Sequence, residues 1–414
     1  MAALENLPKK IRADAPLWGW VVDLPADRPV DVTVKLRDDL GQTWQSDATF
    51  RSSPQGTLDL AGAKPVEAAW VGSDAYGTYW SMELTSPNVG YPMPYFDAAT
   101  ASLDPLRLEL EARVDGAPVA RGEVERRFVF RCIKEEWRND GLVANLFVPV
   151  HPTASQGVLV IGGSSGGFAW SSQVAALIAA SGRAALAVAY FDWQGAYGLP
   201  TSIAEIPLET FVRALDRLKG EPRVLDDDLA VVGYSKGAEA ALLLAAERKD
   251  VRKVVAYAPS SHVWESVRAD PSEPPRSSWT RDGEPLPFVR FEADEEFYRT
   301  LDKTRLRPFH ERALENEGAI RQARIPVERT DADILLVSGT ADSLWPSTPM
   351  CETITRTLKD VGRGSQTYHV AFEGAGHFFF VPGMPVNRMD GSPSVNAYAD
   401  RKGWGAARKH LGLS

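Results

Sequence analysis

The stretch Leu229-Ala-Val-Val-Gly-Tyr-Ser-Lys-Gly-Ala-Glu-Ala-Ala-Leu-Leu-Leu244 decides the fold class of this chain. Its first four residues have the length and composition of a buried strand, and its alanine- and leucine-rich end has high helix propensity. Between them stands G-x-S-x-G, residues 233–237, in the strand–turn–helix context of a nucleophile elbow. Glycines on both sides let strand and helix approach closely. The pattern predicts that Ser235 is a catalytic nucleophile exposed at the end of a sheet.

A serine hydroxyl is a poor nucleophile unless a base takes its proton and a third group orients that base. In elbow enzymes the acid and then the histidine follow the serine along the chain, on loops after later strands. Residues 334–338 form an apolar run that is followed by Gly339 and Asp342, and residues 370–372 are followed by a glycine-rich loop that ends at His377. We therefore predict a triad of Ser235, His377 and Asp342.

Other titratable residues fit this chemistry less well. Three aspartates, residues 226–228, precede the elbow strand, so we expect a solvated turn at the opposite end of the sheet. His262 follows the next strand and could contribute to the pocket, but it stands in the wrong place for the base. The six histidines show no metal-ligand spacing such as H-E-x-x-H, so no metal and no cofactor are expected.

The oxyanion of an acyl-transfer reaction needs preorganised N–H donors. We expect one from the backbone of Lys236, at the start of the helix, and a second from Ser165 in the loop Gly162-Gly-Ser-Ser-Gly-Gly167. A glycine-rich loop after a strand could instead cradle a phosphate, but this one lacks the G-K-[ST] of a P-loop and does not fit G-x-G-x-x-G.

Several residues flank the predicted active-site loops and could contact substrate. Those assigned to substrate binding are Gly163, Ser164, Tyr190 and Trp345. Nearby aromatic residues could line an apolar pocket or simply pack, and nearby cations could meet a phosphorylated substrate or simply be solvated; these are Trp170, Trp193, Phe378, Lys236, Arg268 and Arg276.

The first 131 residues have a different sequence pattern from the rest of the chain. Alternating apolar and polar residues predict short strands, with a hairpin turn at Asp115 and Gly116, which together favour an antiparallel sandwich. Such a part could shape a neighbouring site or serve as a scaffold. The strands are expected at residues 30–36, 44–50, 79–84, 106–114 and 124–130.

From residue 132 onward, apolar strands alternate with helices, which predicts a doubly wound α/β sheet. Residues 262–327 interrupt this rhythm with many prolines and two charged helical stretches, 292–306 and 308–322. Such an excursion could be a lid over the site or a solvated insertion. Other expected helices span residues 171–181, 209–218 and 397–411.

Bulk properties describe an ordinary globular protein of 414 residues with a net charge of −9, which argues against a nucleic-acid partner. Residues 1–15 contain no apolar signal region, and no run is long enough to span a membrane, so we expect a cytoplasmic protein. Cys132 and Cys351 are expected to be reduced core thiols. The oligomeric state is not predicted.

The residues also resemble a known family over nearly the whole chain. Residues 32–44, 56–60 and 77–81, the loop at 162–167, the elbow, and the segments around Asp342 and His377 are similar to the acyl-CoA thioesterase and bile acid-CoA:amino acid N-acyltransferase family. The resemblance implies an immunoglobulin-like β-sandwich domain over residues 1–131 and an α/β-hydrolase domain over residues 132–414, with a lid-like insertion at about 262–327. The nucleophile, acid and base of the family fall on Ser235, Asp342 and His377.

The resemblance implies a serine acyl-transfer enzyme that hydrolyses an acyl-CoA or other acyl thioester, free or carrier-bound. Family members that conjugate bile acids with amino acids use cysteine as the nucleophile. Because this chain has Ser235 at that position, the resemblance favours water as the acceptor of the acyl group. The alternatives are an acyltransferase that uses an amine or alcohol acceptor, an ester or amide hydrolase, and an inactive binding protein. The insertion is longer and more charged than in animal members, so substrate identity does not carry over.

Overall fold

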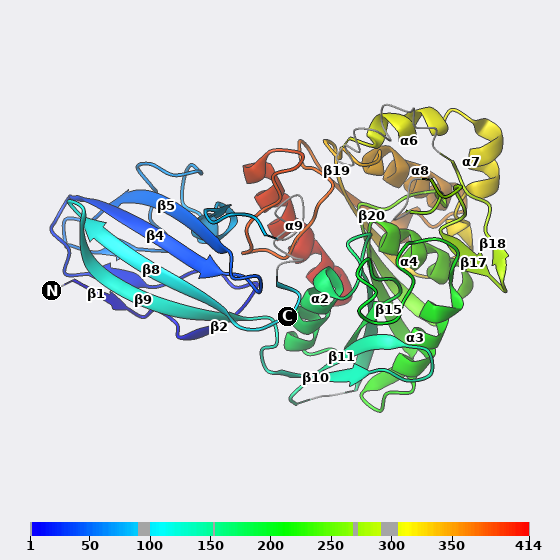
Figure 1. Cartoon of the computed structure of the whole chain (residues 1–414), viewed down its shortest axis with the longest axis horizontal. Helices are drawn as coiled ribbons and strands as arrows, with labels where there is room; N and C mark the ends of the chain where they lie inside the picture. The colour runs from blue at the N-terminus through cyan, green and yellow to red at the C-terminus, as the bar shows by residue number, and fades with distance from the viewer. Residues whose placement is uncertain (1, 90–99, 152–153, 268–271, 291–304, 414) are drawn as a thin grey trace.

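A computed structural model of the chain describes residues 2–89, 100–151, 154–267, 272–290 and 305–413. A strand-rich N-terminal part lies beside a larger part that is built on a mixed α/β sheet, and helix α9 (Pro393–Leu411) runs between them (Figure 1). The Trp404 indole of α9 donates to Asp14, and Arg401 pairs with Asp74, so this helix contacts the N-terminal part directly. No described helix is both long and apolar enough to cross a membrane.

The N-terminal part contains two sheets. A six-stranded sheet has the order β2-β9-β8-β4-β5-β7, and a three-stranded sheet has the order β1-β3-β6. In β4 and β8 alternate residues are buried, as expected for strands with one face on a core. The elements are β1 (Ala3–Glu5), β2 (Lys10–Arg12), β3 (Trp20–Val22), β4 (Pro29–Arg37), β5 (Thr43–Arg51), β6 (Leu58–Asp59), α1 (Gly77–Trp80), β7 (Glu83–Leu84), β8 (Leu106–Val114) and β9 (Ala117–Arg127).

Strands β4, β5 and β8 confirm the predictions at residues 30–36, 44–50 and 106–114. The predicted turn joins β8 to β9, with positive φ angles of 51° at Asp115 and 78° at Gly116. The strand predicted at 124–130 is the end of β9, which stops at Arg127. The immunoglobulin-like topology stays a prediction.

The strand predicted at residues 79–84 is wrong. Helix α1 occupies its first half, and only β7 is extended. Tertiary contacts explain the difference, because the Trp80 indole donates to Asp74 and the Arg126 guanidinium stacks on the Tyr79 ring. Close packing continues at Gly77, where an added Cβ would lie 2.3 Å from the Trp70 ring.

The larger part is organised around an eight-stranded sheet with the order β10-β11-β13-β12-β15-β16-β19-β20. Strands β10 and β11 are antiparallel to their neighbours, and the strands from β13 to β20 are parallel, which makes this a doubly wound α/β-hydrolase sheet, as predicted. The strands are β10 (Cys132–Trp137), β11 (Val143–Pro149), β12 (Ser155–Ile161), β13 (Ala185–Ala189), β15 (Val224–Tyr234), β16 (Val251–Tyr257), β19 (Asp333–Gly339) and β20 (Thr367–Phe372). The predicted domain boundary at residues 131/132 lies between β9 and β10.

Helices cover both faces of this sheet. Buried residues of α2 (Ala169–Ala180) and α9 share a core with the N-terminal strands, whereas α3 (Glu209–Lys219), α4 (Lys236–Glu247) and α8 (Ser347–Asp360) pack in the core of the other face. Helices α2, α3 and α9 match the predictions at residues 171–181, 209–218 and 397–411 within a few residues. The six strands β13, β12, β15, β16, β19 and β20 run parallel to one another, so their carboxyl ends meet at one edge of the sheet.

Two further predictions need correction. Residues 226–228 do not form a turn, because β15 already begins at Val224. The helix predicted at 308–322 is divided into α6 (Arg307–Ala313) and α7 (Glu317–Ala323), since Asn316 caps the second helix by accepting the Ala319 N–H. Most of the helix predicted at 292–306 lies outside the described residues.

Short elements complete the insertion and its surroundings. They are β14 (Ile206–Pro207), β17 (Trp279–Arg281), β18 (Glu284–Pro285), η2 (Val327–Arg329) and η3 (Gly364–Gln366). Strands β14, β17 and β18 form a separate three-stranded sheet. Cys132 and Cys351 are buried free thiols, as predicted.

Candidate active site

Ser235 stands between β15 and α4, at the carboxyl edge of the large sheet. Its backbone has φ 54° and ψ −118°, a strained conformation for a residue with a side chain. The Ser235 N–H donates to the Tyr257 carbonyl, and the Ser235 carbonyl accepts the N–H of Ala238 and Glu239 in the first turn of α4. These bonds hold the turn of the nucleophile elbow.

The flanking glycines are required by close approach. A Cβ added at Gly233 would lie 2.4 Å from the Gly237 carbonyl oxygen, and one added at Gly237 would lie 2.3 Å from the Ile161 oxygen. No side chain fits at such distances. The G-x-S-x-G spacing therefore reflects the packing of β15, α4 and the end of β12 around one turn.

Ser235, His377 and Asp342 lie in hydrogen-bonding order. The Ser235 Oγ is 3.0 Å from His377 Nε2, and His377 Nδ1 is 2.8 Å from Asp342 Oδ2. Because an ionised carboxylate can only accept, Nδ1 carries the proton toward Asp342, and Nε2 is left to accept from the serine hydroxyl. The three residues predicted from sequence are brought together from loops after three different strands.

Further donors hold the acid in place. Asp342 Oδ1 accepts the N–H groups of Leu344 and Trp345, and Oδ2 accepts the Ser347 hydroxyl at 2.6 Å. Asp342 and His377 are both buried. Together with His377, these groups give the buried carboxylate four hydrogen-bond donors, which fix the plane that it presents to the imidazole.

The start of α4 and the loop at residues 162–167 both lie beside Ser235. The Lys236 N–H belongs to the first turn of α4, where helix N–H groups have no partner within the helix. From the loop at residues 162–167, the close approach to the nucleophile is made by Gly163: a Cβ added there would lie 3.2 Å from the Ser235 Cβ. Gly163 thus lies against the serine, and the assignment of a donor to Ser165 stays a prediction.

Two aromatic side chains hold the loop at residues 162–167 through hydrogen bonds to its carbonyl groups. The Tyr190 hydroxyl donates to the Gly162 carbonyl at 3.0 Å, and the Trp193 indole donates to the Ser164 carbonyl at 2.7 Å. Tyr190 is buried against Phe211 and Trp279, and burial raises its pKa strongly. Its placement favours support of the loop over contact with substrate.

The other aromatic residues near the site also pack. The Trp345 indole donates to the Ala258 carbonyl, and its ring lies edge-on to His377 at 5.8 Å between centroids. The Trp170 indole donates to the Phe379 carbonyl. Phe378 lies edge-on to the His377 ring at 5.2 Å. Trp345 and Phe378 thus flank the base, and Trp170 fastens the loop that follows it.

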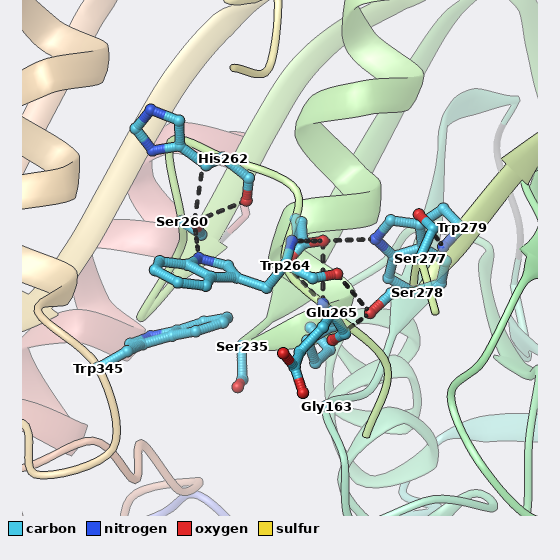
Figure 2. Close-up of polar contacts among 12 residues, drawn as sticks. Gly163, Ser235, Ser260, His262, Trp264, Glu265, Ser277, Ser278, Trp279 and Trp345 are labelled. Carbon is cyan, nitrogen blue, oxygen red and sulfur yellow. Dashed lines mark hydrogen bonds and ion pairs between the residues drawn. The ribbon is translucent and has the colours of Figure 1, made fainter. Parts of the chain in front are cut away.

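The Lys236 side chain is buried in an ion pair, so the prediction that it could contact a phosphate is wrong. Its ammonium is buried and lies 2.9 and 2.8 Å from the two carboxylate oxygens of Glu239, one turn along α4. Glu239 Oε1 also accepts the Trp264 N–H and the Trp279 indole N–H. Figure 2 labels both tryptophans and Ser235. Burial lowers the pKa of Lys236 and raises that of Glu239, while the ion pair opposes both shifts.

This pair had a weak sequence signal: two charges three residues apart in an otherwise apolar helix. Its burial depends on Trp264 and Trp279, which come from the insertion. Of the other two cations considered for phosphate contact, Arg276 pairs with Glu205 in a partly exposed position, and Arg268 lies outside the described residues.

The described part of the insertion is anchored at the site. Arg307 donates to the carbonyls of Thr340 and Asp342 through its guanidinium, and its backbone N–H donates to the Ser343 carbonyl. The His310 ring is buried, 4.5 Å from the Trp264 ring between centroids. The interpretation as a solvated insertion is therefore wrong for these residues, and a lid role stays a prediction.

His262 does not join the triad. Its Nδ1 lies 2.9 Å from the Ser261 hydroxyl, and its backbone N–H donates to Ser260 Oγ. Burial lowers its pKa to about 4. The imidazole is therefore neutral near pH 7, and its role is in packing of the insertion.

The N-terminal part contacts the loop that follows the base. The Val386 N–H donates to the Trp80 carbonyl at 3.1 Å, and the buried Arg126 guanidinium donates to the Gly383 carbonyl. Arg388 adds a bond to the Ser81 carbonyl. The strand-rich part is therefore in direct contact with residues 377–390, which carry the candidate base.

Comparison with known proteins adds the family. Residues 15–137 match the family model of the acyl-CoA thioester hydrolase/BAAT N-terminal region, and residues 206–409 match that of the BAAT/acyl-CoA thioester hydrolase C terminal region. The chain belongs to the BAAT/acyl-CoA thioester hydrolase family. Both family regions are present in their usual order, and the resemblance seen in the sequence is confirmed.

Relatives in the BAAT/acyl-CoA thioester hydrolase family align over most of the chain. Acyl-coenzyme A thioesterase 1 of Rattus norvegicus is 27% identical over 90% of this chain and 84% of its own length. The peroxisomal succinyl-coenzyme A thioesterase of Mus musculus is 26% identical with the same coverage. A solved structure of a putative dienelactone hydrolase from Klebsiella pneumoniae covers 68% of this chain and 98% of its own, with a TM-score of 0.43 and 14% identity.

Proposed function

We propose that the protein is a serine acyl-transfer enzyme that hydrolyses an acyl-CoA or another acyl thioester through a covalent acyl-serine. One observation carries the proposal: Ser235 Oγ, His377 Nε2 and Nδ1, and Asp342 Oδ2 form a continuous chain of hydrogen bonds in a family member. Relatives named as acyl-CoA thioesterases support the substrate class.

The first half-reaction forms the acyl-enzyme. His377 Nε2 takes the proton from Ser235 Oγ as the oxygen attacks the thioester carbonyl, and Asp342 stabilises the imidazolium. The oxyanion of the tetrahedral intermediate accepts the Lys236 N–H and an N–H of the loop at residues 162–167, which holds Ser165 and lies nearest Ser235 at Gly163. The carbon–sulfur bond then breaks, and the thiolate leaves with the proton from His377.

The second half-reaction releases the acid. His377 Nε2 takes a proton from water, whose oxygen attacks the acyl carbon, and the bond to Ser235 Oγ breaks as the proton returns to that oxygen. The same base can activate an amine or alcohol in place of water. The leaving thiol comes from the substrate, free or carrier-bound, and these steps need no cofactor.

The test compares wild-type protein with Ser235→Ala. Both are assayed against acyl-CoA thioesters of increasing chain length and an acyl-carrier thioester, with and without glycine as an amine acceptor. Thiol release reports turnover, and mass spectrometry of the product distinguishes the free acid from an amide. We expect wild-type turnover to the free acid and loss of at least about 10⁴-fold in the variant. Turnover retained by Ser235→Ala would overturn the assignment.

A further inference from the structure

A second buried carboxylate, Asp390, lies next to the triad and contacts none of the reacting atoms. Its Oδ2 accepts the His377 N–H at 2.7 Å, the Ser343 N–H at 3.1 Å and the Ser343 hydroxyl at 3.1 Å. Its Oδ1 accepts the Asn387 amide at 2.8 Å. Among the described residues, all four donors are uncharged groups that converge on one side chain.

The two backbone donors belong to different triad loops. Ser343 directly follows the acid Asp342 on the loop after β19, and His377 is the base on the loop after β20. Asp390 Oδ2 therefore accepts hydrogen bonds from the backbone N–H groups of both Ser343 and His377, and so links the two loops. The two loops also bond directly through the Ala341 N–H and the Ala375 carbonyl. Asp342 and His377 themselves meet only through their side chains, so the bridge that Asp390 adds beside them helps to fix the alignment of that contact.

Asp390 is itself held firmly. The Asn396 side chain of α9 donates to the Asp390 carbonyl at 2.8 Å and accepts the Gly376 N–H at 2.9 Å, one residue before the base. A Cβ added at Gly376 would lie 2.0 Å from Asp390 Oδ1, so only glycine permits this approach. Gly391, which follows Asp390 in the chain, has φ 65° and turns the chain toward α9. The carboxylate thus has one orientation available.

We propose that Asp390 is a positioning residue that holds His377 and Asp342 in catalytic alignment by clamping the backbones of their two loops. The proposal rests on the proposed function, because the alignment matters only if His377 is the base. Loss of the clamp lets the imidazole shift relative to Ser235 and Asp342. A displacement of about 1 Å at a catalytic group can cost about 100-fold in rate.

The experiment uses Asp390→Ala, Asp390→Asn and a matched control, Asp38→Ala. Asp38 is 8% exposed, compared with 9% for Asp390, and it also accepts four hydrogen bonds, from Leu40, Gln42 twice and Trp44. It lies between β4 and β5, in the N-terminal part. The control therefore loses a similar buried hydrogen-bond hub without touching either triad loop.

The measurements are kcat and KM for the best thioester, the rate at which a fluorophosphonate labels Ser235, and the downfield proton NMR signal of His377 Nδ1–H. We expect Asp390→Ala to lower kcat about 100-fold with KM changed less than about threefold, to slow labelling, and to shift or broaden the proton signal. Asp390→Asn keeps one acceptor oxygen for the backbone donors, so its kcat should lie between wild type and Asp390→Ala. Asp38→Ala should keep kcat within about twofold per folded molecule.

The clamp is refuted if folded Asp390→Ala keeps wild-type kcat and proton signal, or if Asp38→Ala loses as much rate as Asp390→Ala. If Asp390→Ala does not fold, Asp390→Asn decides, and wild-type kcat in that variant overturns the proposal. Labelling needs no thioester. If the wild type labels but hydrolyses no thioester, the proposed function has failed while the labelling rates of the variants still test the clamp.

Discussion

Replacement of Lys236 by methionine should destabilise the protein strongly, although the lysine ammonium contacts no substrate in the proposed reaction. Lys236 is 3% exposed and Glu239 is not exposed at all, and the ammonium contacts both carboxylate oxygens within 2.9 Å. Methionine has a similar volume but no charge. The change therefore leaves the Glu239 carboxylate buried without its cation.

Removal of one partner of a buried ion pair costs about 3–5 kcal/mol. Two donors remain on Glu239 Oε1, from the Trp264 backbone and the Trp279 indole, so we expect the lower end of that range. The double variant Lys236→Met/Glu239→Gln buries no charge, and the glutamine oxygen keeps both tryptophan donors. It should be more stable than Lys236→Met by about 2 kcal/mol, since only one amide group is left unpaired at about 1–3 kcal/mol.

The penalty should depend on pH. Without Lys236, burial raises the folded-state pKa of Glu239 above its unfolded value of about 4.3. The folded variant then holds a proton that the unfolded chain releases, so its stability is retained below pH 4.3 and falls as pH rises through the folded-state pKa. Lys236→Met should thus be closer to wild type at pH 5.5 than at pH 8.

The assay is urea unfolding, followed by tryptophan fluorescence at pH 5.5 and pH 8. It compares wild type, Lys236→Met, Glu239→Gln and the double variant. A destabilisation below about 1 kcal/mol at pH 8, or single-variant effects that simply add, would contradict a buried ion pair of this strength, because contacting charges in a buried pair must couple. A penalty independent of pH would show that Glu239 does not take up the proton.

Three further outcomes follow from the geometry. Asp342→Asn should lower kcat about 10⁴-fold while the protein stays folded, because an amide toward Nδ1 selects the wrong imidazole tautomer; steady-state kinetics check this, and a loss below tenfold would contradict it. Gly163→Ala should lower kcat about 100-fold per folded molecule, since the new Cβ would lie 3.2 Å from the Ser235 Cβ and 3.1 Å from the Tyr234 carbonyl oxygen and would move the loop that faces the oxyanion; an unchanged kcat would remove Gly163 from the site. Burial lowers the pKa of His310 to about 4, so the wild-type urea midpoint should fall as pH drops from about 6.5 to 4, and His310→Gln should lessen that fall; equal slopes would contradict the assignment.

Much of the site could be predicted from the sequence because its signals are local. An apolar strand, G-x-S-x-G and an alanine-rich helix specify the elbow within sixteen residues. Asp342 and His377 each follow an apolar run on a loop, and the order of parallel strands brings such loops to one edge. Strands β4, β5 and β8 could also be predicted from the sequence, because the alternation of buried and exposed residues is a property of a single strand.

The remaining features depend on contacts between distant segments. Whether Lys236 is exposed or buried is decided by two tryptophans of the insertion, which cover the start of α4. The loop at residues 162–167 approaches Ser235 at Gly163, and Gly237 packs against the end of β12; the loop sequence alone does not encode this approach.

The clamp at Asp390 had no sequence signal at all. An aspartate before Gly-Ser-Pro resembles an ordinary turn residue, and only the packing of α9 on the sheet brings its carboxylate to two loops. The sequence alone predicted most strands and helices of the large sheet and the candidate nucleophile, base and acid, because short-range patterns encode both. The tertiary structure alone decided which polar groups are buried together, because burial depends on side chains that converge from far along the chain.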